Sequence, residues 1–108
     1  MSAREETPRL AEVIARNGFV YRLDRRNKFA YLYKQMLNDR IIGYEVFLAV
    51  PVKRRRIGKK EIPAHDRFPG NNDFGIFAFA YTADDYAQAL IKFGELTGKA
   101  KALKKNKY

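Results

Sequence analysis

The sequence contains no cysteine, and its other absences also narrow the classes of protein to which it can belong. Without cysteine it has no disulfide and no thiolate metal site, which fits a reducing compartment. No apolar run approaches the roughly eighteen residues that a membrane-spanning helix needs. The N-terminal stretch MSAREETPRL has no hydrophobic signal core. We therefore expect a cytoplasmic protein with no membrane association.

Groups suited to catalysis are also scarce, because the chain has a single histidine. His65 precedes Asp66, but adjacent side chains in an extended segment point apart, so the pair does not make a catalytic dyad by itself. One histidine without cysteine is a poor metal-binding set. The triplet at residues 73–75 has the letters of the kinase metal-binding motif, but the other kinase motifs are missing. We expect a non-enzymatic protein with no catalytic residues, no metal and no cofactor.

Positive charge is abundant and unevenly distributed. Twenty-two Lys and Arg oppose twelve Asp and Glu, giving a net charge of +10 and a pI near 10.0. Residues 22–28 carry +3, residues 53–60 carry +6 and residues 99–107 carry +5, so the rest of the chain is mildly acidic at −4. A single cluster is often only a solvated surface, but three clusters favour a surface that binds a polyanion.

The N-terminal residues predict a short helix over residues 8–16. Thr7 is an acceptable N-cap, and Pro8 suits the first helical position. Apolar residues then recur at helical spacing. The pair at residues 17 and 18, Asn-Gly, is a common C-terminal stop for a helix.

Beyond this helix the hydrophobic period changes to two, which predicts strands over residues 19–24, 29–36, 41–52 and 74–81. An apolar stripe at helical spacing predicts a second helix over residues 82–97, ending at Thr97 and Gly98. The basic tail, residues 99–108, is either loose or adds further turns of helix. We expect one domain over residues 1–98. Its fold class is α+β, an antiparallel meander of four or five strands with an N-terminal and a C-terminal helix packed on it.

Residues 53–62 predict a basic hairpin that extends beyond the main sheet, with Ile57 and Gly58 near its turn. A two-stranded ribbon fits the major groove of a duplex, and clustered cations contact phosphates. The candidate nucleic-acid-binding residues are the cations of this hairpin, of the turn near residue 25 and of the tail: Arg25, Arg26, Lys53, Arg54, Arg55, Arg56, Lys59, Lys60, Lys101, Lys104 and Lys105.

Aromatic residues make up 14% of the chain and offer a second mode of contact. Exposed rings on a sheet stack on unpaired bases. Tyr21, Tyr31 and Tyr33 are the candidates, and we expect only one or two of them to be exposed. The alternative is that a domain of this size needs most of its aromatic residues for its core.

The order of several segments resembles that of small uncharacterised open reading frames of bacteriophages and prophages. The residues that carry this resemblance are Gly43-Tyr-Glu-Val-Phe47, Ile62-Pro63-Ala-His-Asp66, Phe68-Pro69 and Asp73-Phe74-Gly75. A basic stretch separates the first of these segments from the others, and an amphipathic helix follows the last. The resemblance covers roughly residues 41–97. It implies a phage accessory protein made in the bacterial host cytoplasm, and it carries no catalytic residues over to this chain.

Two functions remain open on this sequence. The first is non-enzymatic binding of nucleic acid, DNA or RNA, which is mainly electrostatic and weakly sequence-specific. The second is binding to an acidic surface of a protein, for instance a host enzyme that the accessory factor modulates. In the second case residues 62–75, with their prolines and Phe68, would supply specificity. A structural component of a virion is a third and weaker hypothesis.

Overall fold

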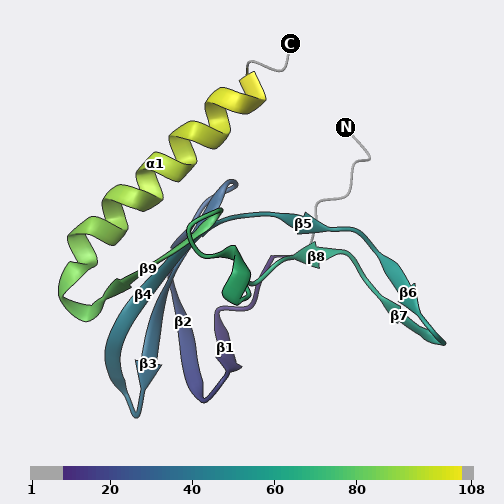
Figure 1. Ribbon diagram of the computed structural model, residues 1–108, viewed down its shortest axis with the longest axis horizontal. Helices are drawn as coiled ribbons and strands as arrows, with labels where there is room; N and C mark the ends of the chain where they lie inside the picture. The colour runs from purple at the N-terminus through teal and green to yellow at the C-terminus, as the bar shows by residue number, and fades with distance from the viewer. Residues whose placement is uncertain (1–8, 106–108) are drawn as a thin grey trace.

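The computed structural model describes residues 9–105, which form a five-stranded antiparallel sheet and one long helix (Figure 1). The strand order is β1-β2-β3-β4-β9. The bounds of these elements are β1 (Val13–Arg16), β2 (Phe19–Arg26), β3 (Ala30–Leu37), β4 (Arg40–Leu48), β9 (Ala78–Thr82) and α1 (Tyr86–Lys105). The predicted α+β class and the predicted antiparallel sheet of four or five strands are confirmed, and the sheet has five strands.

The predicted N-terminal helix is wrong, because its described part, residues 9–16, contains no helix and ends in strand β1. β1 pairs with β2 in a register that sets Arg16 opposite Phe19. Asn17 and Gly18, at φ of 55° and 84°, form the two-residue turn between these strands. An Asn-Gly pair suits both a helix end and a hairpin turn, and here β-branched residues in β1 favour the hairpin. Thr7 and Pro8 lie outside the described residues.

Two predicted strands are shorter than expected. The strand predicted over residues 41–52 leaves the main sheet after Leu48, and residues beyond it form the short strand β5 (Pro51–Val52). β5 pairs with β8 (His65–Asp66) in a separate two-stranded sheet. The strand predicted over residues 74–81 begins only at Ala78, because Gly75, at φ of 89°, lies in a turn.

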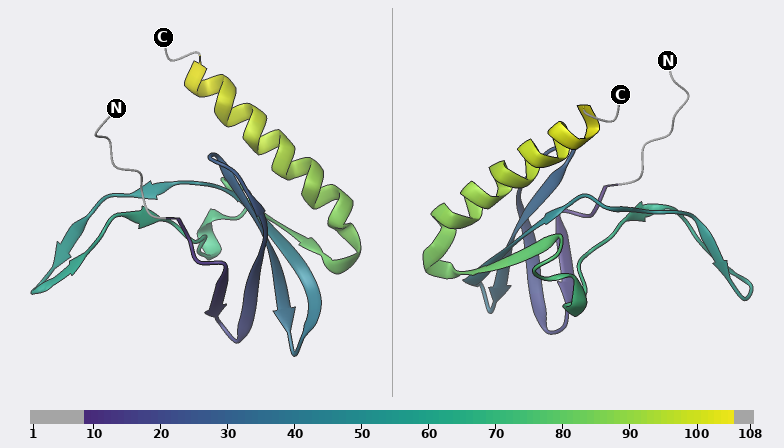
Figure 2. Two further views of the ribbon diagram at one scale, coloured as in Figure 1. Left: turned by 180° about the vertical axis from the view of Figure 1, so that it is seen from behind. Right: turned by 45° about the horizontal axis from the view of Figure 1, so that its top comes forward.

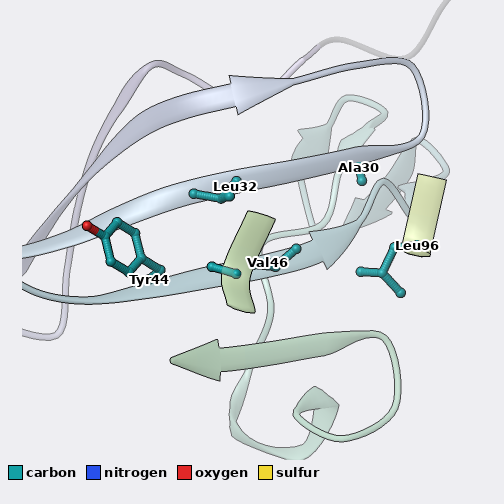
Figure 3. Packing of buried hydrophobic residues seen from close by; sticks show 6 residues of the cluster. Ala30, Leu32, Tyr44, Val46 and Leu96 are labelled. Atoms are coloured by element: carbon teal, nitrogen blue, oxygen red, sulfur yellow. The ribbon is translucent and has the colours of Figure 1, made fainter. Parts of the chain in front are cut away.

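Helix α1 covers one face of the sheet. Leu32 and Val46 are completely buried there and form a cluster with Leu96 of the helix (Figure 3). A short 3₁₀ turn at Ala83–Asp85 precedes α1, and α1 passes the predicted stop at Gly98. A single glycine costs a helix only about 1 kcal/mol relative to alanine, and good helix formers surround this one. Within residues 9–105 no helix has the length and apolarity to cross a membrane.

The opposite face of the sheet is covered by an irregular segment, residues 67–77, which we call the strap. Phe68 of the strap packs edge-on against Tyr21 and Phe47, with ring centroids 5.1 and 5.4 Å away. Arg67 donates two hydrogen bonds of 3.1 Å to the carboxylate of Asp73, which also accepts one from a strap backbone amide. The strap is therefore closed on itself and anchored in the core by an aromatic ring.

Candidate nucleic-acid interface

Residues 51–66 form an extended arm that leaves the sheet and folds back on itself. β5 and β8 make its base, and β6 (Arg55–Ile57) and β7 (Lys60–Ile62) make its outer hairpin. All views show the arm pointing away from the sheet and from helix α1 (Figures 1 and 2). Every residue from 53 to 61 is exposed. The basic hairpin predicted from the sequence is thus present, and it projects beyond the main sheet.

The strand register divides the side chains of the hairpin between two faces. Arg55 lies opposite Ile62 and Ile57 lies opposite Lys60, so these four residues share one face. We call this the apolar-basic face. Arg56 lies opposite Glu61 on the other face. The carboxylate of Glu61 also accepts a long hydrogen bond of 3.5 Å from Arg54. The apolar-basic face therefore carries cations without an acidic side chain among them.

The hairpin turn is a two-residue loop of Gly58 and Lys59. Gly58 has φ of +61°, a backbone conformation that L side chains rarely adopt. Glycine in the first position of such a loop is typical of type II′ turns, whose twist matches that of the flanking strands. The turn therefore holds Lys59 and the end of β6 at the tip of the arm.

The base of the arm is fixed to the sheet by a buried carboxylate. Asp66, only 3% exposed, accepts a hydrogen bond of 2.5 Å from the hydroxyl of Tyr31 on β3. The guanidinium of Arg9 lies 3.8 Å from the same carboxylate and 4.7 Å from the centre of the Tyr31 ring. Burial, with the neighbouring carboxylate, raises the pKa of the Tyr31 hydroxyl, so it stays protonated and remains a donor. These contacts give the arm a rigid attachment.

The turn between β2 and β3 carries the second group of predicted cations. Arg25 and Arg26 are exposed at the end of β2. Arg25 donates to its neighbour Asp24 at 3.3 Å, and Arg26 donates to a backbone carbonyl at 3.5 Å. Both side chains keep an exposed charge at this end of the sheet.

The third group lies on α1. Lys101 is exposed on the helix, and Lys104 and Lys105 belong to the helix although their side chains lie outside what the structure describes. The tail predicted from residue 99 onward is thus helical as far as residue 105. Of the two alternatives for the tail, a loose segment or further turns of helix, the structure shows further turns of helix.

Contacts of Asn27 link the turn between β2 and β3 with α1 and with Arg9, whereas Arg25 lies toward the start of α1, where its guanidinium donates to the Tyr86 hydroxyl at 3.5 Å. The Asn27 side chain donates to Thr97 of α1 at 2.9 Å, one turn before the basic end of the helix. Its backbone carbonyl accepts a hydrogen bond from Arg9, which also pairs with Asp66 at the base of the arm. The base of the arm, the turn between β2 and β3 and the second half of α1 are therefore linked at one edge of the molecule, from which the outer hairpin projects away from α1 (Figure 1). We call this edge the basic edge.

Arg9 is a residue of this edge that sequence reasoning missed. Its position was assigned to the predicted helix, where it had no expected partner. The clue available in the sequence was its position before a β-branched run followed by Asn-Gly, the pattern of a hairpin. With that strand assigned, Arg9 would be expected to lie in an extended segment beside the sheet.

The predicted exposure of the tyrosines is wrong. Tyr31 and Tyr33 are completely buried and Tyr21 is 4% exposed, so none of the three offers a free ring face to a base. Tyr31 and Tyr33 stack with Phe47 beneath the strap. The period of two places Tyr31 and Tyr33 on the same face of their strand, but it could not show that the strap covers that face.

The His65 and Asp66 side chains serve separate local contacts. The Nδ1 atom of His65 lies 2.9 Å from the backbone carbonyl oxygen of Pro63, and Asp66 points to Tyr31. Within residues 9–105 no cluster of three or more histidine or carboxylate side chains is placed to hold a metal ion. The basic edge is therefore the feature of the described chain from which a function is best argued.

No protein-family model, curated protein or solved structure matches this chain significantly. Function must therefore be argued from the geometry and charge of the chain itself.

Proposed function

We propose that this chain is a small non-enzymatic nucleic-acid-binding protein, whose binding is mainly electrostatic and weakly sequence-specific. The observation that carries the proposal is the arm. Six of its eight residues from 53 to 60 are cations, all exposed, on a two-stranded ribbon that projects from the body. Phosphate contacts of this kind supply affinity without reading sequence.

The remainder of the basic edge supports the same function. Arg25, Arg26 and Lys101 add exposed positive charge outside the arm. The rest of the chain is mildly acidic, so the field of the molecule has a direction that steers a polyanion to this edge. A role as a phage accessory protein, made in the host cytoplasm, fits the proposal.

The test removes positive charge from the arm. The resulting loss of nucleic-acid affinity is compared with the loss caused by removing the same charge elsewhere. The arm variant carries Arg54→Ala, Arg55→Ala and Arg56→Ala. The matched control carries Arg16→Ala, Lys34→Ala and Arg40→Ala, which removes the same charge from β1, β3 and β4, outside the three basic clusters. Fluorescence anisotropy with labelled DNA and RNA, single- and double-stranded, measures the affinity, and circular dichroism confirms folding.

We expect the arm variant to bind at least about tenfold more weakly at low salt, whereas the control binds within a few fold of the wild type. Equal losses in the two variants would mean that net charge, not the arm, governs binding. If the wild-type protein binds no nucleic acid even at low salt, the charge would instead steer the chain to an acidic protein surface. A pull-down after nuclease treatment would then be the next experiment.

A further inference from the structure

The tip of the arm carries an apolar side chain that the fold does not use. Ile57 is the last residue of β6, directly before the turn, and it is 55% exposed. Its cross-strand neighbour is Lys60, and it belongs to neither of the two buried clusters of the sheet. A polar β-branched residue would suit this strand equally well, so the strand itself does not require isoleucine at this position.

The surroundings of Ile57 indicate what it contacts. It shares the apolar-basic face with Arg55 and Lys60, and Lys59 follows in the turn. The end of the ribbon therefore presents two kinds of group. The cations attract phosphates, and the aliphatic side chain favours an apolar environment. Proteins that bend DNA use this combination, inserting an apolar wedge between base pairs from the minor groove.

We propose that the arm binds double-stranded DNA in the minor groove and that Ile57 inserts between two adjacent base pairs, bending the duplex. This inference rests on the proposed nucleic-acid-binding function and names the ligand of the same site. An undistorted minor groove is about 6 Å wide. The two strands of a ribbon are already about 4.8 Å apart before side chains are counted. Only the tip of the arm enters such a groove, and Ile57 lies at the tip.

The base of the arm supplies the stiffness that a wedge needs. Asp66 is bonded to Tyr31 of the sheet, and the amide of Arg67 donates to the carbonyl of Val50 at 2.9 Å. Insertion loses base stacking, and the bend that results brings more phosphates toward the basic edge. The minor groove of an RNA duplex is wide and shallow and offers no such wedge site, so the inference excludes RNA as the preferred duplex.

The experiment measures bending and affinity separately. A DNA duplex of about 25 base pairs carries a donor and an acceptor fluorophore at its two ends, and it is used intact or with a central nick that makes bending easy. The wild type is compared with Ile57→Thr, which keeps the β-branched shape but adds a hydroxyl, and with Ile57→Val, which stays apolar. Ile76→Thr is the matched control, because Ile76 is 75% exposed in a turn outside the arm.

We expect the wild type, the Ile57→Val variant and the Ile76→Thr variant to raise energy transfer on the intact duplex, whereas Ile57→Thr leaves it near that of free DNA. The wild type should bind the nicked duplex about tenfold more tightly than the intact one, and Ile57→Thr should bind both almost equally. The salt dependence of binding should be shallower for Ile57→Thr than for the other three proteins, because an unbent duplex brings fewer phosphates to the basic edge.

Two results would overturn the inference while leaving the proposed function intact. One is duplex binding without bending, with equal affinity for nicked and intact DNA. The other is strong binding to RNA or single strands with none to duplex DNA. If the wild type binds no nucleic acid of any kind at low salt, the proposed function fails and the inference fails with it.

Discussion

Glu45 is the residue whose environment is most unusual for its type. It lies in the middle of β4 and is only 8% exposed. The hydroxyl of Tyr21 donates to its carboxylate at 3.4 Å, and Gln35 in turn donates to that hydroxyl at 3.1 Å. Desolvation raises the pKa of Glu45 above its ordinary value of 4.5, and the Tyr21 hydrogen bond and the charge of Arg16 oppose this shift only in part.

A raised pKa in the folded state has a definite consequence for stability. The folded protein binds more protons at Glu45 than the unfolded chain does, so this residue makes the protein less stable as the pH rises from about 4.5 through the folded-state pKa. Above that range the buried carboxylate is charged, and its desolvation opposes folding.

We therefore predict that Glu45→Gln increases the free energy of unfolding at pH 7 and that the difference disappears below about pH 4.5. Glutamine has a similar shape and still accepts from Tyr21 through its carbonyl oxygen. The measurement is urea unfolding of both proteins across this pH range. Glu95→Gln is the control, since the Glu95 side chain is 60% exposed and should change little. A variant less stable than the wild type at pH 7 would show that the charged contacts outweigh desolvation.

The hairpin of the arm is the element on which the functional account depends. Its one carboxylate belongs to Glu61, and neutralising this side chain should increase the affinity for nucleic acid. Glu61 lies opposite Arg56 and close to Arg54, so it offsets part of the positive charge on its face. It is exposed and its ion pair is long, so the pair adds little stability.

Replacing Glu61 by Gln should therefore tighten binding to DNA several-fold at low salt, with no loss of folding. The reason is that one negative charge leaves a surface that faces phosphates. Anisotropy titrations of Glu61→Gln and of the matched variant Glu95→Gln on α1 measure the effect. Unchanged affinity for Glu61→Gln, or an equal gain for Glu95→Gln, would show that the hairpin does not contact the nucleic acid.

Elements whose signals are local were predicted well. The period of two identified β2, β3 and much of β4, and the basic hairpin followed from a glycine between two charged runs. Asn17-Gly18 was interpreted as a helix end, but it forms a hairpin turn. Residues with positive φ are common in both structures. Whether the residues before Asn17 form a helix or a strand depends on their pairing with β2. The helical spacing of three apolar residues does not show that pairing.

The ends of elements and the covered faces were predicted less well. α1 continues through Gly98 because the residues around it favour a helix. The burial of Tyr33 depends on the strap, whose anchor Phe68 packs edge-on against it from 35 residues away in sequence. Nothing local to a strand shows which of its faces an irregular segment will cover. The exposed hairpin that carries the arm cations was predicted from the sequence, the binding role of these cations stays a prediction, and the exposure expected of the tyrosines is wrong.

At the scale of the whole molecule, the fold places charge groups that are far apart in sequence beside one another. Asn27 contacts both the helix and Arg9, and Arg9 contacts the base of the arm. The sequence shows three separate basic clusters, and the packing of β2, β3 and α1 links the base of the arm to the turn between β2 and β3 and to the second half of α1. An exposed basic arm that projects from a mildly acidic body is the central feature of the functional account.

The most direct test of that account is the dependence of duplex DNA affinity on salt concentration, measured by anisotropy with the full chain. If the six cations of residues 53–60 each neutralise a phosphate, the slope of log K against log salt should be about −5. Tight binding that weakens with such a slope is the predicted result. A slope near zero, or no binding even at low salt, would contradict the claim that the basic edge binds nucleic acid.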